Sequence, residues 1–192
     1  MKDSTDRHDR RSIRLQGYNY AHPGAYFITV CTQDRKCLFG EIINGEVQLN
    51  PFGDVVVEEW IKTARVRKDI ELDSFVVMPN HFHGIIGLLD SPTIGMPSGP
   101  VSGSIGAIIG QFKSVASKRI NGMKGTPGSP VWQRNYYEHV IRNQNELNKI
   151  REYIHSNPPQ WALDRENPSV HGTGSRTAPT EAIEQIFGGV RP

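Results

Sequence analysis

Two histidines separated by one residue are candidate metal ligands. His81 and His83 lie on either side of Phe82, at the start of an apolar run that follows Pro79-Asn80. In a β-strand, side chains two residues apart point to the same face and lie about 6.6 Å apart along the strand. Two imidazoles that face the same way can share one divalent metal ion, and that ion can hold a phosphate. Such a pair also occurs by chance, so a second element must support this interpretation.

A later helix carries a tyrosine and an asparagine that could complete such a site. An apolar stripe at helical spacing predicts a helix over residues 145–157. Tyr153 and Asn157 are four residues apart and therefore share one face of this helix. A phenol and an amide oxygen on one face could supply a nucleophile and a metal ligand. A structural alternative stays open, in which Tyr153 packs at the edge of the core and Asn157 ends the helix before Pro158.

The elements that would position these side chains follow from the hydrophobic pattern. The predicted order is a strand at 25–32, a hairpin turning at Asn44-Gly45, a helix at 51–66, strands at 70–78 and 81–89, a helix at 105–120, an extended segment at 131–141 and a helix from 143 or 145 to 156. Pro79-Asn80 predicts a tight antiparallel connection between the two central strands. We therefore expect an α+β fold, a ferredoxin-like split βαβ sandwich with a central antiparallel sheet and helices on it.

The length and composition of the chain predict one folded domain. A chain of 192 residues is long enough for a single core. We expect a basic segment at residues 1–17, a catalytic domain at 18–164 and a polar, loosely ordered tail at 165–192. No apolar run reaches the roughly 18 residues that span a bilayer. Two cysteines without a second pair favour free thiols in a reducing cytoplasm over a zinc site.

The distribution of charge points to a phosphate-rich partner. Residues 110–151 contain two acidic residues and eight basic ones: Lys113, Lys118, Arg119, Lys124, Arg134, Arg142, Lys149 and Arg151. Such a block is typical of nucleic-acid binding, although it could also be a solvated face whose charges pair elsewhere. Lys113, Arg134 and Arg142 are the candidate phosphate contacts, which would position DNA without reading its sequence.

The combined pattern resembles the single-tyrosine HUH transposases, specifically the REP-associated tyrosine transposase family of bacteria. The matching segments occur in the family's order and spacing over residues 18–160, and they are 76–85, 112–114, 131–142 and 153–158. The segments include Pro79-Asn80-His81-Phe82-His83-Gly84 and Trp132-Gln133-Arg134-Asn135-Tyr136-Tyr137. Any one segment would be weak evidence, but the four together are specific.

The resemblance implies an HUH endonuclease fold and a metal-dependent endonuclease and strand transferase acting on single-stranded DNA. By carry-over, His81 and His83 bind the metal, Asn157 completes its ligands and Tyr153 is the nucleophile that forms a 5′-phosphotyrosine link. The expected ion is Mg²⁺ or Mn²⁺, of which Mn²⁺ suits imidazole ligands better. The expected partners are hairpin or REP-type palindromic DNA and a second copy of the chain. The expected location is the cytoplasm, at the nucleoid when the protein is bound to DNA.

Other residues and other functions remain as alternatives. His139 and His155 could assist the chemistry, and Tyr136 is a second candidate nucleophile. A domesticated DNA-binding protein with little cleavage activity would keep the fold without the reaction. A phosphodiesterase that uses a His-x-His metal site and water would need no tyrosine at all.

Overall fold

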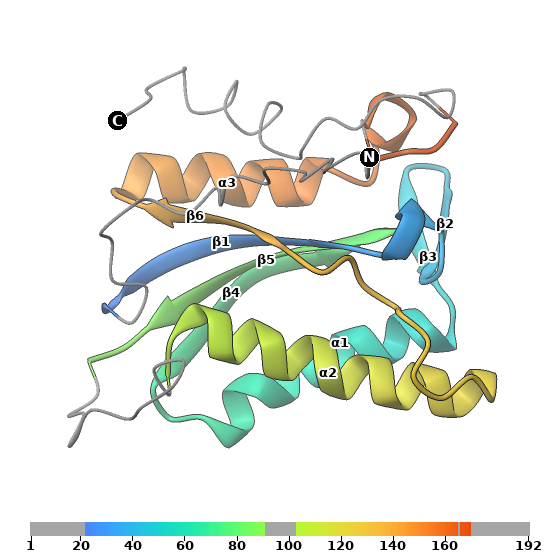
Figure 1. Ribbon diagram of the computed structural model, residues 1–192. Coiled ribbons are helices and arrows are strands. Elements are labelled where there is room, and N and C mark those ends of the chain that lie inside the picture. The colour runs from blue at the N-terminus through green and yellow to red at the C-terminus, as the bar shows by residue number, and fades with distance from the viewer. Residues whose placement is uncertain (1–21, 91–102, 165, 170–192) are drawn as a thin grey trace, which may run out of the picture.

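A four-stranded antiparallel sheet forms the middle of the protein, with helices on both faces (Figure 1). This computed structural model describes residues 22–90, 103–164 and 166–169. The sheet order is β4-β5-β1-β6, and the strands are β1 (Gly24–Cys31), β4 (Ile70–Val77), β5 (His81–Leu88) and β6 (Tyr137–Ile141). The other elements are β2 (Gly40–Ile43), β3 (Glu46–Leu49), α1 (Pro51–Val66), α2 (Ile105–Lys124), α3 (Gln144–Ser156) and two short 3-10 helices, η1 (Gln33–Arg35) and η2 (Trp161–Leu163).

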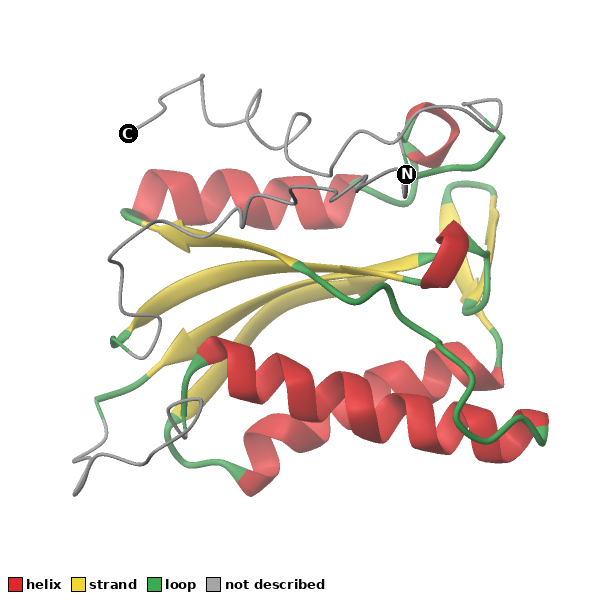
Figure 2. Ribbon diagram, viewed as in Figure 1, coloured by secondary structure: helices red, strands yellow, loops and turns green. Residues whose placement is uncertain are grey.

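The predicted ferredoxin-like α+β fold is confirmed, with one refinement. Helices α1 and α2 cover one face of the sheet, whereas α3 lies alone on the other, so the protein has three layers (Figure 2). The predicted hairpin is also present, because Asn44 and Gly45 adopt positive φ angles of 53° and 80° between β2 and β3. The predicted segment at 1–17 lies outside the described residues, as does most of the predicted tail at 165–192.

The extended segment predicted at 131–141 is shorter than expected as a strand. Only Tyr137–Ile141 forms β6, while Trp132 makes an isolated bridge to Thr32. Between them, the ammonium group of Lys113 donates hydrogen bonds to three successive backbone carbonyl oxygens, those of Gln133, Arg134 and Asn135, at 2.7, 3.0 and 3.4 Å. The ladder is interrupted there, and Lys113 supplies hydrogen-bond donors to carbonyl groups that a continuous strand would have paired with its neighbour.

The strands distribute their side chains to two separate cores. In β1, Tyr26, Ile28 and Val30 pack against the layer of α1 and α2. Phe27 points the other way and packs with Ile150 and Ile154 of α3. Because successive side chains of a strand alternate between faces, each strand contributes to both cores. No helix in the described part of the chain is long and apolar enough to cross a membrane.

Salt-bridge contacts fix α3 to the sheet. Arg151 of α3 donates from Nε to Oδ1 of Asp73 at 3.0 Å and from Nη2 to Oδ2 at 2.5 Å. These hydrogen bonds from Arg151 lower the pKa of Asp73 from 3.8 to about 2, although partial burial opposes the shift. A bidentate guanidinium–carboxylate pair restricts rotation as well as translation, so it sets which face of α3 meets the sheet.

We predict that Asp73→Asn lowers the free energy of unfolding by about 0.5–1 kcal/mol near neutral pH, the range of a partly exposed pair. A carboxylate whose pKa is lowered on folding stabilises the protein above its unfolded-state pKa, and this contribution is lost as the pH falls through the folded-state value. The difference between wild type and variant should therefore shrink between about pH 4 and about pH 2. Urea denaturation at several pH values measures it, with Glu41→Gln on the exposed hairpin as control. A difference that does not change with pH would contradict this origin.

Gly84 makes room for two aromatic rings beneath the histidine strand. A Cβ atom at this position would lie 2.7 Å from Cζ of Phe82 and 2.9 Å from Cζ2 of Trp60. Gly84→Ala should therefore destabilise the protein by about 1–3 kcal/mol through overpacking. Gly122 on α2 is the matched control, because its Cβ would meet no atom within 4 Å. Gly122→Ala should stabilise by about 0.5–1 kcal/mol, and equal effects of the two substitutions in thermal unfolding would refute the packing argument.

Candidate active site

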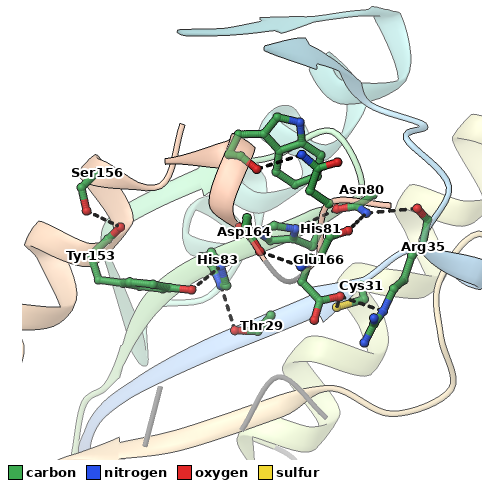
Figure 3. Close-up of polar contacts among 12 residues, drawn as sticks. Thr29, Cys31, Arg35, Asn80, His81, His83, Tyr153, Ser156, Asp164 and Glu166 are labelled. Carbon is green, nitrogen blue, oxygen red and sulfur yellow. Dashed lines mark hydrogen bonds and ion pairs between the residues drawn. The ribbon is translucent and has the colours of Figure 1, made fainter. Parts of the chain in front are cut away.

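His81 and His83 lie side by side on the sheet face that α3 covers (Figure 3). Both imidazoles are buried, with exposed fractions of 0% and 2%, and their ring centroids are 4.5 Å apart. The antiparallel register places Cys31 of β1 opposite His81 and Thr29 opposite His83. The structure thus gives the two imidazoles the shared direction that strand spacing predicts.

Hydrogen bonds hold each imidazole through its Nδ1 atom. Nδ1 of His83 is 2.8 Å from the hydroxyl of Thr29, and Nδ1 of His81 is 2.9 Å from Oδ1 of Asn80. The amide of Asn80 is oriented by its own Nδ2, which donates to the carbonyl oxygen of Arg35 at 3.0 Å and to that of Glu166. Since an amide oxygen only accepts, the proton of His81 must be on Nδ1, which leaves a lone pair on Nε2. This is how ligating histidines are usually prepared for a metal.

Burial keeps both imidazoles neutral. It lowers the pKa of His81 to about 4, although the negative charge of Asp164 partly opposes this shift. It also lowers the pKa of His83 well below its ordinary value, and the neighbouring His81 adds to the effect. A metal ligand must be deprotonated, so these buried imidazoles are ready to bind at neutral pH without losing a proton.

Helix α3 places the tyrosine hydroxyl next to this pair. Its N-terminus is capped by the side chain of Asn143, which accepts from the backbone nitrogen of Glu146. Tyr153 then reaches the sheet, where its hydroxyl lies 3.3 Å from Nε2 of His83. Burial, together with the negative charge of Asp164, raises the pKa of Tyr153 well above its ordinary value. The phenol is therefore protonated at neutral pH, and it needs a nearby positive charge to become a nucleophile.

Two buried polar atoms near the tyrosine lack partners. Within the described residues, neither Nε2 of His81 nor Oδ1 of Asn157 makes a hydrogen bond. Asn157 is 4% exposed, and its side chain influences the pKa of both His81 and Tyr153, which places it beside them. An unpaired buried acceptor is costly, and a bound cation would satisfy both of these atoms at once.

The residues present therefore fit a divalent metal ion. His81, His83 and Asn157 offer two imidazole nitrogens and an amide oxygen. In the described part of the chain no three His, Cys, Asp or Glu side chains form a ready metal-binding group. Of the candidate ligands predicted from the sequence, His81 and His83 belong to these residue types, and Asn157 supplies an amide oxygen.

Sequence reasoning missed the segment that follows α3. The chain turns back after Asn157 and continues into η2. The ring centroids of Trp161, in η2, and His81 are 6.1 Å apart. Glu166 and Asn167 are both 7% exposed, although they fall in the predicted loose tail at 165–192. Glu166 forms an ion pair with Arg35 at 2.9 Å. The local sequence is polar, and only the distant residues that bind it show that it packs.

Three residues of the predicted basic block bind other groups of the same chain. Arg119 pairs with Glu58 at 2.6 Å and Glu59 at 2.7 Å, and Arg151 pairs with Asp73. Lys113 binds the three backbone carbonyls described above, and burial lowers its pKa to about 8. Arg134 and Arg142 form no ion pair with another described residue, so they remain the better candidates for phosphate contacts.

The alternative side chains have other partners. Nε2 of His139 is 2.8 Å from a carboxylate oxygen of Glu146. The hydroxyl of Tyr136 donates to Glu138 at 2.7 Å. His155 is exposed on α3. Of the two candidate tyrosines, Tyr153 is the one whose hydroxyl meets the paired imidazoles.

Comparison with known proteins supports a relationship to transposases. The sequence pattern of the family described as "Transposase IS200 like" matches residues 23–157. An uncharacterized protein of Haemophilus influenzae (strain Rd) is 40% identical over 169 residues, which cover 82% of this chain and 93% of that protein. The structure of a REP-associated tyrosine transposase bound to a REP hairpin has a TM-score of 0.53 and 23% identity, over 80% of this chain and 76% of that one. At this identity the likeness shows a shared fold, whereas the sequence match is decisive: the chain belongs to the IS200-like family of transposases.

Proposed function

We propose that this transposase is a metal-dependent endonuclease and strand transferase for single-stranded DNA, with Tyr153 as its nucleophile. The observation that carries the proposal is the position of the Tyr153 hydroxyl, 3.3 Å from Nε2 of His83. Beside it are the unpartnered Nε2 of His81 and Oδ1 of Asn157. A phenol, two neutral imidazoles and an amide oxygen are the groups that a tyrosine-dependent phosphoryl transfer requires.

The cleavage step forms one bond to the scissile phosphorus and breaks another. The Tyr153 hydroxyl lies 3.3 Å from Nε2 of His83, the nitrogen that would bind the ion, so the attacking oxygen lies beside the place where a phosphate would be held. The phenol gives its proton to water as its oxygen bonds to the scissile phosphorus, and the bond from phosphorus to the 3′-oxygen breaks. That oxygen takes up a proton and leaves as a 3′-hydroxyl, while the 5′-phosphate stays on the tyrosine. A divalent ion bound by His81, His83 and Asn157 would neutralise charge on the phosphate and lower the cost of ionising the phenol.

Strand joining is the reverse of this step with another DNA end. A free 3′-hydroxyl attacks the phosphotyrosine phosphorus, and the tyrosine oxygen leaves with its proton restored. One phosphoester replaces another, so the exchange requires no nucleotide hydrolysis. The expected ion is Mg²⁺ or Mn²⁺, and the imidazole ligands favour Mn²⁺.

The proposed substrate is a folded single strand, a hairpin of palindromic sequence, bound by a homodimer. The similar transposase structure contains a REP hairpin, and this supports the same class of DNA here. Arg134 and Arg142 are proposed to contact its phosphates. A second candidate function is DNA binding with little cleavage. The raised pKa of Tyr153 favours this alternative as long as no cation is bound.

Replacing the tyrosine separates these functions. With a hairpin oligonucleotide and Mn²⁺, the wild type should form a covalent adduct that carries a 3′ label of the DNA but no 5′ label. Tyr153→Phe should abolish the adduct, because it removes the attacking oxygen, and should leave binding affinity unchanged. Tyr136→Phe is the matched control and should retain the adduct. Denaturing gel electrophoresis and a filter-binding titration measure the two properties.

Each other outcome identifies another function. An adduct that survives Tyr153→Phe but not Tyr136→Phe would identify Tyr136 as the nucleophile. Cleavage without an adduct would indicate water as nucleophile and hence a phosphodiesterase. Tight binding with neither adduct nor cleavage in the wild type would indicate a DNA-binding protein.

Metal removal should abolish cleavage and preserve the fold. After treatment with a chelator, adduct formation should fall at least about a hundredfold, because burial raises the pKa of Tyr153 and no cation then favours its ionised form. Adding Mn²⁺ should restore the reaction, whereas the far-ultraviolet circular dichroism spectrum should be the same in all three states. Full activity in the chelated protein would contradict the proposed metal dependence.

A further inference from the structure

The segment after α3 brings a carboxylate to the candidate metal site. Oδ2 of Asp164 lies 3.8 Å from Nε2 of His81, and the Asp164 side chain is only 13% exposed (Figure 3). Neither the strand pattern nor the tyrosine helix identifies this residue. Its position follows from the turn of the chain after Asn157.

The atoms that face each other across this gap are both acceptors. Nδ1 of His81 carries the proton that is donated to Asn80, so Nε2 presents a lone pair. Oδ2 of Asp164 is a carboxylate oxygen and presents lone pairs as well. Two such atoms repel one another unless a proton or a cation lies between them. At 3.8 Å the separation is too long for a hydrogen bond, but it suits a shared cation.

The spacing agrees with two ligands of one ion. Ligand atoms at about 2.1 Å from a metal are about 3.0 Å apart when they subtend a right angle and about 4.2 Å apart when they are opposite. The distance between Oδ2 of Asp164 and Nε2 of His81 falls inside this range. A carboxylate also supplies a negative charge, which two imidazoles and an amide lack, and it would increase the affinity for a hard divalent ion.

The local structure holds the carboxylate in this orientation. Oδ1 of Asp164 accepts a hydrogen bond from the backbone nitrogen of Glu166 at 2.7 Å. The backbone nitrogen of Asp164 donates to the carbonyl of Trp161 at 3.1 Å, and its own carbonyl accepts from Asn167 at 3.0 Å. With one oxygen and both backbone groups engaged, Oδ2 is the atom left to face His81.

Asn80 connects this segment to the histidine. Its Oδ1 accepts from Nδ1 of His81, while its Nδ2 donates to the carbonyl of Glu166. Asn80 is fully buried, and Arg35 adds an ion pair to the side chain of Glu166. One amide therefore orients His81 and also anchors the turn that carries Asp164.

We propose that Asp164 becomes a fourth protein ligand when the metal ion binds, together with His81, His83 and Asn157. Without the ion, no three His, Cys, Asp or Glu side chains of the described residues form a ready metal-binding group. This inference rests on the metal dependence proposed above. Four protein ligands leave about two positions of an octahedral ion for phosphate oxygen or water. The segment after α3 then has a role in assembling the site, and the site is complete only when this segment is folded onto the sheet.

Direct metal binding tests the proposal without DNA. The metal-free full-length protein is titrated with Mn²⁺, and free Mn²⁺ is measured by its electron paramagnetic resonance signal. Asp164→Asn should raise the dissociation constant at least about tenfold, because a charged ligand becomes a neutral one. Glu41→Gln, at an exposed position of β2, should leave the constant unchanged, and His81→Ala should weaken binding at least as much as Asp164→Asn.

A second measurement separates loss of a ligand from loss of stability. The rise in Tm that Mn²⁺ causes is recorded within each variant, relative to the same variant without metal. This rise should be smaller for Asp164→Asn than for the wild type, even if the metal-free Tm values differ. Asparagine retains an oxygen that can accept from the nitrogen of Glu166, so the turn should persist.

The remaining results overturn the proposal in distinguishable ways. Equal affinity of Asp164→Asn and wild type, with adduct formation intact, would refute the role of Asp164 but leave the proposed function standing. Tighter Mn²⁺ binding or faster cleavage by Asp164→Asn would show that the carboxylate occupies the phosphate position instead. Absence of Mn²⁺ binding by the wild type would refute this proposal and the metal dependence together.

Discussion

The antiparallel pairing of β1 with β5 is the constraint on which the candidate site depends. Alternation along β5 sends Phe82 toward α1 and α2 and sends His81 and His83 toward α3. The register then places Thr29 opposite His83. A shift of one residue would bury the phenylalanine beneath α3 and turn both imidazoles into the larger apolar core. The core on one face thus fixes the register that the chemistry on the other face requires.

Burial has opposite effects on the two kinds of titratable group in the site. It lowers the pKa of the imidazoles, which could therefore bind a metal ion without first losing a proton. It raises the pKa of Tyr153, which makes the phenol unreactive. A cation is the one addition that suits both groups, since it binds neutral imidazoles and favours a phenolate. The same desolvated environment therefore supports the proposed metal dependence.

Much of the fold could be predicted because its signals are local. The hairpin at Asn44-Gly45, the helix at 51–66 and the two central strands are encoded in turn residues and in apolar spacing. The length of the strand within 131–141 could not be predicted in this way, because Lys113, which binds carbonyl groups in the interrupted stretch, belongs to α2. The charge pattern also did not show which basic residues are available for DNA, since Arg119 and Arg151 pair with carboxylates far away in the sequence.

The sequence by itself determined the types and spacing of His81, His83, Tyr153 and Asn157, and through strand and helix periodicity it determined which of them share a face. Only the tertiary structure brought the strand and the helix together and showed which atoms have no partner. It also showed that Asp164 and Glu166 pack on the site. The physical reason is that periodicity is a property of neighbouring residues, whereas hydrogen-bond partners and burial depend on contacts across the whole chain.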